Sequence, residues 1–169
     1  GLDLDAIGKE NLFDPRGDGR DLPDLMRACS KPIIAAVNGH AITGGFELAL
    51  HADIVVAGEN AQFGQPEINL GIIPGAGGTQ RLVRVAGKAL AMKMVLSGEF
   101  ICARDALAAG IVAEVTQPET TFERSLELAQ VIAGKPPIAL RLAKECVLQA
   151  FETSLQQGLE MERKAFLFL

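Results

Sequence analysis

The fold of this chain is decided by one stretch, Pro32-Ile-Ile-Ala-Ala-Val-Asn-Gly-His-Ala-Ile-Thr-Gly-Gly-Phe-Glu47. It opens with an uninterrupted apolar run that ends in Asn-Gly, which is typical of a strand buried on both faces. Residues 44–52 then have the pattern of a helix that is apolar around most of its circumference, and residues 53–57 return to a strand pattern. The order strand, glycine turn, buried helix and strand predicts a βαβ unit within a layered α/β fold.

The rest of the chain is expected to be mostly helical. Extended pieces are predicted at 61–64 and 111–115, and helices at 79–85, 88–96, 103–109, 119–133, 137–151 and from 155 onward. The polar residues 8–21 contain Pro15, Gly17 and Gly19 and predict a loop.

The composition limits the possible functions. Of the 169 residues, 49% are hydrophobic and 22% are charged, and no apolar run approaches the ~20 residues that a membrane span needs. A net charge of −5, with neither Trp nor Tyr, argues against a nucleic-acid groove. The three cysteines form no CxxC and no His-bearing metal pattern, so we expect free thiols in a reducing compartment and no metal site.

Both ends of the sequence look internal. The chain begins at Gly1 without a Met, and it stops at Leu169 within an apolar helical pattern. We therefore expect a piece of a longer protein that is incomplete at both ends.

Two glutamates in glycine-rich surroundings are the strongest functional signal. Glu47 follows Gly44-Gly45, and Glu67 lies twenty positions further on, at the end of Phe63-Gly-Gln-Pro-Glu67. Paired carboxylates beside backbone that can approach a ligand closely are what general acid and base chemistry on a carbonyl compound requires. A glutamate in the first turn of a helix is usually a solvated residue, but the glycines and apolar neighbours of Glu47 favour a functional role. The sequence therefore predicts an enzyme.

A further glycine-rich segment, Gly75-Ala-Gly-Gly-Thr79, allows two interpretations. It resembles a phosphate cradle at a helix start, but it lacks the Gly-Lys-Ser/Thr ending of a nucleotide-binding loop. We favour a tight turn beside the glutamates over a phosphate site.

Four other polar residues are interpreted as structural. His40 and His51 could act as bases, and Asp3 with Asp5 could hold a metal ion, but no further ligands follow at a suitable spacing. Structural roles are favoured for both histidines, and positioning of a loop for both aspartates.

Four separated motifs together resemble the enoyl-CoA hydratase/isomerase (crotonase) superfamily, and within it the enoyl-CoA hydratases. The motifs, which occur in the order typical of that superfamily, are Gly1-Leu-Asp-Leu4, the segment 35–49, Phe63-Gly-Gln-Pro-Glu67, and Gly71-Ile-Ile-Pro-Gly-Ala-Gly-Gly-Thr-Gln-Arg-Leu82. The similarity continues through Ser97-Gly-Glu and Ala108-Ala-Gly-Ile-Val112 to the C-terminal helices.

The resemblance implies an α/β fold built as a spiral of ββα turns. Residues 1–115 would form the core of this spiral domain without its first strands, and residues 116–169 a truncated C-terminal helical region. Assembly as a homotrimer or homohexamer is also implied, and an apolar stripe over 155–169 fits burial at such an interface. The implied compartment is the cytoplasm for a bacterial protein, with the mitochondrial matrix as the alternative.

The resemblance also assigns roles to individual residues. When water adds to an enoyl thioester, negative charge develops on the thioester oxygen, and the backbone N–H groups of Leu2 and Gly44 would stabilise it. Gly44 suits this role on its own, because it begins a helix and has no Cβ. Glu47 would activate the water, Glu67 would deliver a proton to C2, and the N–H of Gly75 would contact the water.

The predicted function is hydration of the C2=C3 bond of a 2-enoyl-CoA, in fatty-acid or aromatic-acid degradation. CoA is part of the substrate, so no cofactor is expected. A Δ3-Δ2 enoyl-CoA isomerase is the alternative enzyme, and a non-catalytic binding member of the same fold is the third hypothesis. The presence of both glutamates favours the hydratase.

The sequence departs from the family pattern at two places. It has Asp5-Ala6-Ile7 where a basic residue is common, and Thr43 where a third glycine is common.

Overall fold

The structure is a computed structural model that describes residues 22–169. Its strands form two small sheets. The first has the order β1 (Ile34–Val37), β3 (Ile54–Gly58) and β6 (Glu114–Thr116), with all pairs parallel. The second has the order β2 (His40–Ile42), β4 (Gln62–Gly64) and β5 (Phe100–Cys102), with β2 and β4 parallel and β5 antiparallel to β4.

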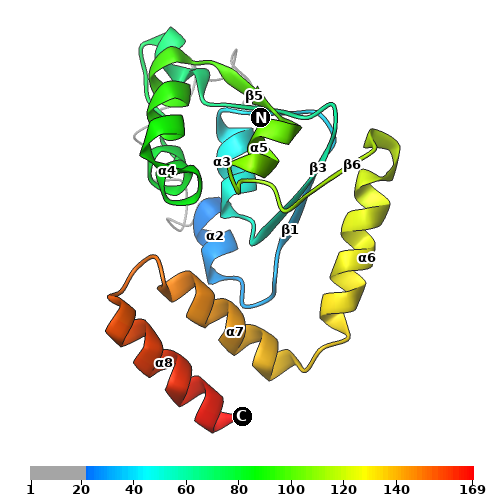
Figure 1. Ribbon diagram of the computed structural model, residues 1–169, viewed down its shortest axis with the longest axis vertical. Helices are drawn as coiled ribbons and strands as arrows, with labels where there is room; N and C mark the ends of the chain where they lie inside the picture. The colour runs from blue at the N-terminus through cyan, green and yellow to red at the C-terminus, as the bar shows by residue number, and fades with distance from the viewer. Residues whose placement is uncertain (1–21) are drawn as a thin grey trace.

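Seven α-helices lie in the described part of the chain (Figure 1). They are α2 (Leu22–Ala28), α3 (Gly44–His51), α4 (Gly78–Ser97), α5 (Ala103–Ala108), α6 (Thr121–Ala133), α7 (Pro137–Gln149) and α8 (Leu155–Phe168). Two short 3-10 helices, η1 (Pro66–Leu70) and η2 (Pro118–Thr120), precede α4 and α6.

The chain distributes its strands between the sheets in a repeating order. One turn consists of β1, β2 and α3, and the next consists of β3, β4, η1 and α4, so that each turn adds one strand to each sheet. Ile34 pairs with Ile54 in the first sheet and His40 pairs with Gln62 in the second, so the second turn follows the first at a distance of about twenty residues. Glu47 lies in α3 of the first turn and Glu67 in η1 of the next, so the two glutamates come from successive turns of the spiral.

The βαβ prediction is confirmed, with one correction. Helix α3 spans Gly44–His51, and β1 and β3 flank it as parallel neighbours. The prediction that the first strand is buried on both faces is wrong, because Ala36 of β1 is exposed. Among the described strands β1 has only β3 as a neighbour, and Ala36 borders a cleft of about 680 Å³ between β1, α6 and α7.

Other predicted elements shift by a few residues. The strand expected at 111–115 is β6 at Glu114–Thr116. The two helices expected at 79–85 and 88–96 are confirmed as the two parts of α4, which a kink at Gly87 separates. Gly87 interrupts α4 with a φ of 76°, which a residue without a Cβ adopts readily. The predicted loop at 8–21 lies outside the described residues.

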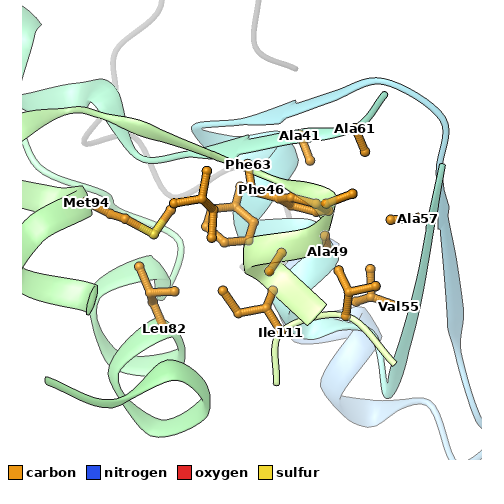
Figure 2. Packing of buried hydrophobic residues seen from close by; sticks show 14 of the residues in the cluster. Ala41, Phe46, Ala49, Val55, Ala57, Ala61, Phe63, Leu82, Met94 and Ile111 are labelled. Atoms are coloured by element: carbon orange, nitrogen blue, oxygen red, sulfur yellow. The ribbon is translucent and has the colours of Figure 1, made fainter. Parts of the chain in front are cut away.

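The core lies between the two sheets and helices α3, α4 and α5. Phe46 of α3 and Phe63 of β4 are fully buried, and their ring centroids are 5.5 Å apart in a tilted arrangement that aromatic pairs favour. Figure 2 shows Met94 and Leu82 of α4 on one side of this pair. This packing places the start of α3 and the start of α4 against the same core.

Helices α7 and α8 form an antiparallel pair below the sheets in Figure 1. Lys144 of α7 donates to Asp53 Oδ2 at 2.7 Å, and the same oxygen accepts from the N–H of Ile33 at 2.7 Å. This largely buried ion pair connects α7 to the residue that precedes β3. Helix α8 begins with a capping box at Ser154 and Gln157, and it packs mainly on α7.

Residues 22–169 contain neither a membrane-spanning helix nor a metal-binding cluster. No helix in this range is long and apolar enough to cross a membrane. The same residues contain no group of three or more His, Cys, Asp or Glu side chains that could hold a metal ion.

Candidate active site

Glu47 is held by the turn that precedes α4. Its side chain leaves the first turn of α3 and is buried, and Oε1 accepts hydrogen bonds from the N–H groups of Ala76 at 2.7 Å and Gly78 at 2.8 Å. The other oxygen, Oε2, has no partner among the described residues. Since every fully buried side-chain oxygen in these residues has a partner, Oε2 reaches accessible space, where it can meet a ligand. The tight turn expected beside the glutamates is confirmed.

The geometry of this turn depends on glycine. Gly77 has a φ of 99°, in the left-handed region that side chains rarely adopt. A Cβ on Gly78 would lie 2.6 Å from the end of the Gln65 amide and 2.9 Å from Pro74 Cβ. Glycine at positions 77 and 78 therefore allows the turn to direct the N–H groups of Ala76 and Gly78 at one carboxylate.

Glu67 is positioned by η1 and by a buried glutamine. Pro66 begins η1, and Glu67 follows in its first turn with its side chain buried. Gln65 is fully buried, and with its amide nitrogen facing Glu67 it donates to Oε1 at 2.9 Å and to Oε2 at 3.1 Å. This orientation is assigned from the hydrogen-bond network, because the opposite one would set the amide oxygen against acceptors.

The environment of Glu67 acts on its pKa in both directions, because burial favours the protonated form and the hydrogen bonds from Gln65 favour the ionised form. Burial raises the pKa of Glu67 above the ordinary 4.5, and the charge of Glu47 raises it further. A hydrogen bond from its own backbone acts in the opposite direction. A carboxyl group with a raised pKa is suited to donate a proton near neutral pH.

Gly44 is the first residue of α3, where N–H groups have no partner within the helix. Thr43 precedes it with a φ of 53° and a ψ of −128°, a conformation that costs a non-glycine residue about 1–3 kcal/mol. The surrounding bonds hold it there, because the N–H of Thr43 donates to Gly64 at 3.0 Å and its carbonyl accepts from Phe46 and Glu47 at 2.9 Å each. Thr43 thus adopts a backbone conformation that glycine would adopt without strain, and these hydrogen bonds hold it there.

The remaining residues considered from the sequence lie in different parts of the chain, and some of them are outside the described residues. Leu2, Asp3 and Asp5 lie outside the described residues. Gly75 precedes the two donors to Glu47, and no described residue accepts a hydrogen bond from its own N–H. His40 is exposed on β2, whereas His51 at the end of α3 contacts the backbone of Glu47.

The family model described as enoyl-CoA hydratase/isomerase matches residues 1–168. The chain belongs to this family. The expected α/β spiral fold is confirmed by solved structures of enoyl-CoA hydratases. One from Geobacillus kaustophilus has a TM-score of 0.92 at 41% identity, over 99% of this chain and 66% of that chain. One from Bacillus anthracis has a TM-score of 0.82 at 41% identity, over 85% and 56%.

Curated relatives in the enoyl-CoA hydratase/isomerase family are named as hydratases, which are hydro-lyases. The 2,3-dehydroadipyl-CoA hydratase of Escherichia coli is 51% identical over 172 residues, which cover all of this chain and 67% of the relative. The mitochondrial enoyl-CoA hydratase of Pongo abelii is 52% identical over 143 residues, which cover 85% of this chain and 49% of the relative. The chain thus spans about half to two thirds of the length of these relatives.

Sequence reasoning missed three residues of this enoyl-CoA hydratase/isomerase site. Ala76 and Gly78 supply the N–H groups that hold Glu47, although only Gly75 was singled out. Gln65 lies within the motif at 63–67, where no role was predicted for it, and it is the partner of Glu67. A polar residue two positions before a candidate catalytic carboxylate, directly after a buried strand, is a signal that could have identified it.

The raised pKa of Glu67 predicts a stability effect of Glu67→Gln. A carboxyl whose pKa is higher in the folded state stabilises the fold fully below its unfolded value, and this contribution is lost as the pH rises. Glu67→Gln should therefore melt at a higher temperature than wild type at pH 7.5, and the difference should shrink as the pH approaches 4.5. Thermal unfolding followed by circular dichroism at both pH values measures this.

The exposed Glu119→Gln is the matched control and should melt like wild type at each pH. A Glu67→Gln protein that melts below wild type at pH 7.5 would contradict the prediction.

Proposed function

We propose that the complete protein is an enoyl-CoA hydratase, which adds water across the C2=C3 bond of a 2-enoyl-CoA to give a 3-hydroxyacyl-CoA. The observation that carries this proposal is the pairing of two buried carboxylates in different states of hydrogen bonding. Glu47 is fixed through one oxygen and has the other accessible, and Glu67 has a raised pKa. The family and the names of its relatives support the same reaction.

The geometry suggests how the two carboxylates divide the proton transfers. The fixed carboxylate of Glu47 directs Oε2 towards the attacking water and accepts its proton, while Glu67 delivers a proton to C2 of the substrate. The enolate charge on the thioester oxygen is stabilised by the N–H of Gly44 and, in the complete site, by that of Leu2. Gly75 offers a further N–H to the water. These protein groups supply all the proton transfers, so the proposed reaction uses no cofactor apart from the CoA of the substrate.

The substrate is proposed only as a class, an acyl-CoA thioester. The Escherichia coli relative is named for 2,3-dehydroadipyl-CoA, whose acyl group ends in a second carboxylate, and another relative is a short-chain-enoyl-CoA hydratase of Clostridium acetobutylicum. Fatty-acid and aromatic-acid degradation both remain proposals for the pathway. The bacterial and mitochondrial relatives likewise support either a cytoplasmic or a mitochondrial matrix location.

The absorbance of the conjugated enoyl thioester tests the proposed reaction in the complete protein. Loss of absorbance from a 2-enoyl-CoA means hydration and supports the proposal. A gain of absorbance from a 3-enoyl-CoA without hydration would make the protein an isomerase, and no change with either substrate would make it a binding protein.

We further propose that the complete protein is a homotrimer or homohexamer. Leu155, Leu159, Phe166 and Leu169 at the C-terminal end are between 54% and 80% exposed, so α8 presents an apolar face that the described residues do not cover. Family resemblance supports burial of this face between subunits. Light scattering at micromolar concentration should give the mass of three or six chains, and a stable monomer would refute the proposal.

A further inference from the structure

His51 joins the end of α3 to the start of α4. Its Nδ1 lies 2.8 Å from the carbonyl oxygen of Glu47, and its Nε2 lies 3.0 Å from Nε of Arg81. The Nε of arginine can only donate, so Nε2 of His51 must accept. The ring is therefore neutral and carries its proton on Nδ1, from which it donates to Glu47.

Hydrogen bonds connect Glu47 through His51 and Arg81 to the same turn that holds the Glu47 carboxylate. The N–H of Arg81 donates to the carbonyl of Gly77 at 2.9 Å, and Gly77 lies between the two residues whose N–H groups hold Glu47 Oε1. A Cβ on Gly77 would lie 3.5 Å from both Arg81 Nε and His51 Cε1, so the pair packs against this turn. Glu47 is thus fixed at its carboxylate by the turn and at its carbonyl by His51.

The charges around His51 come from three helices. Burial lowers its pKa below the ordinary 6.5, and Arg81 of α4 and Arg27 of α2 lower it further. The carbonyl and the charge of Glu47 in α3 act in the opposite direction. A proton on Nε2 would remove the acceptor for Arg81 and place two cations in contact.

We propose that neutral His51 is a positioning residue, which through Arg81 holds the Gly75–Gly78 turn in the arrangement that orients Glu47, and that protonation of His51 releases this turn. The inference rests on the proposed hydration by Glu47. Both ring nitrogens of His51 are already engaged by Glu47 and Arg81, so we expect its loss to lower kcat and to leave KM nearly unchanged. A small misplacement of a reacting group can cost up to ~10²-fold in rate.

The experiment compares His51→Leu, His51→Gln and Arg81→Met in the complete protein. The matched control is His40→Leu, at an exposed position of β2. We expect His51→Leu and Arg81→Met to lower kcat by about 10-fold to 10²-fold at pH 8. A glutamine keeps an acceptor that does not titrate near neutral pH. We expect the kcat of wild type to decrease below pH 6.5, where His51 becomes protonated. His51→Gln should retain most activity, and its kcat should not show this decrease.

Nitrogen NMR of the labelled imidazoles gives a readout that does not depend on activity. The signal that disappears in His51→Leu should show a neutral ring with its proton on Nδ1 at pH 7. A protonated ring, or a proton on Nε2, would overturn the inference, as would unchanged kcat in both His51→Leu and Arg81→Met. If wild type hydrates no enoyl-CoA, the proposed function fails. The NMR result then decides the His51 arrangement separately.

Discussion

Glu67→Gln and Glu47→Gln should each lower kcat for hydration by at least ~10²-fold in the complete protein, with little change in KM. Glutamine keeps the shape of each side chain but can neither donate nor accept the transferred proton as a carboxyl group does. The N–H groups of Ala76 and Gly78 can still bond an amide oxygen at position 47, so the turn should remain in place. Initial rates over a range of enoyl-CoA concentrations separate kcat from KM.

The two variants should differ in isomerisation. Moving a double bond requires one carboxylate to shuttle a proton, so Glu47→Gln should retain isomerisation of a 3-enoyl-CoA while Glu67→Gln loses it. His40→Ala, on the exposed side of β2, is the control and should keep most activity. Near-normal hydration by either glutamine variant would remove that glutamate from the mechanism.

Gly44→Pro should lower hydration by ~10²–10³-fold, the usual effect of losing one donor to a developing oxyanion. Proline has no N–H, and it is well tolerated as the first residue of a helix, the position that Gly44 occupies in α3. The variant lacks the donor, but the proline also restricts the backbone of the preceding Thr43, so folding is measured beside activity. Enoyl-CoA kinetics and far-ultraviolet circular dichroism measure activity and helix content on the same sample.

The neighbouring Gly45→Ala is the matched control for this effect. A Cβ at Gly45 would meet no atom within 4 Å, so the variant should fold and retain activity. A folded Gly44→Pro protein with a normal rate would show that the thioester oxygen binds elsewhere.

The main elements could be predicted because their signals are local. The apolar run before Asn38 and the apolar residues of 44–52 correspond to β1 and α3, and their order predicted a parallel βαβ unit. The strands β2 and β5 were not predicted. They have three residues each, but β4 and β6 are equally short, so length alone does not explain the difference. The exposure of Ala36 depends on which segments lie beside β1, and that is not a property of the strand's own sequence.

The site could be predicted in its residue types but not in its hydrogen bonds. Glu47 and Glu67 stood out because carboxylates are unusual among glycines and apolar residues. The bonds that hold them come from Ala76, Gly78 and Gln65, and backbone donors leave no mark in a side-chain pattern. The link between His51 and Arg81 joins residues thirty positions apart, so it follows from the packing of two helices.

The absence of a side chain at Gly78 also constrains how this protein can evolve. An alanine there would press on Gln65 from one side and on Pro74 from the other, so no single compensating substitution would make room for it. Gln65 in turn bonds Glu67, and a smaller residue at that position would give up this contact. We therefore expect substitutions at positions 65, 74 and 78 to have non-additive effects on stability, because the three residues are in contact.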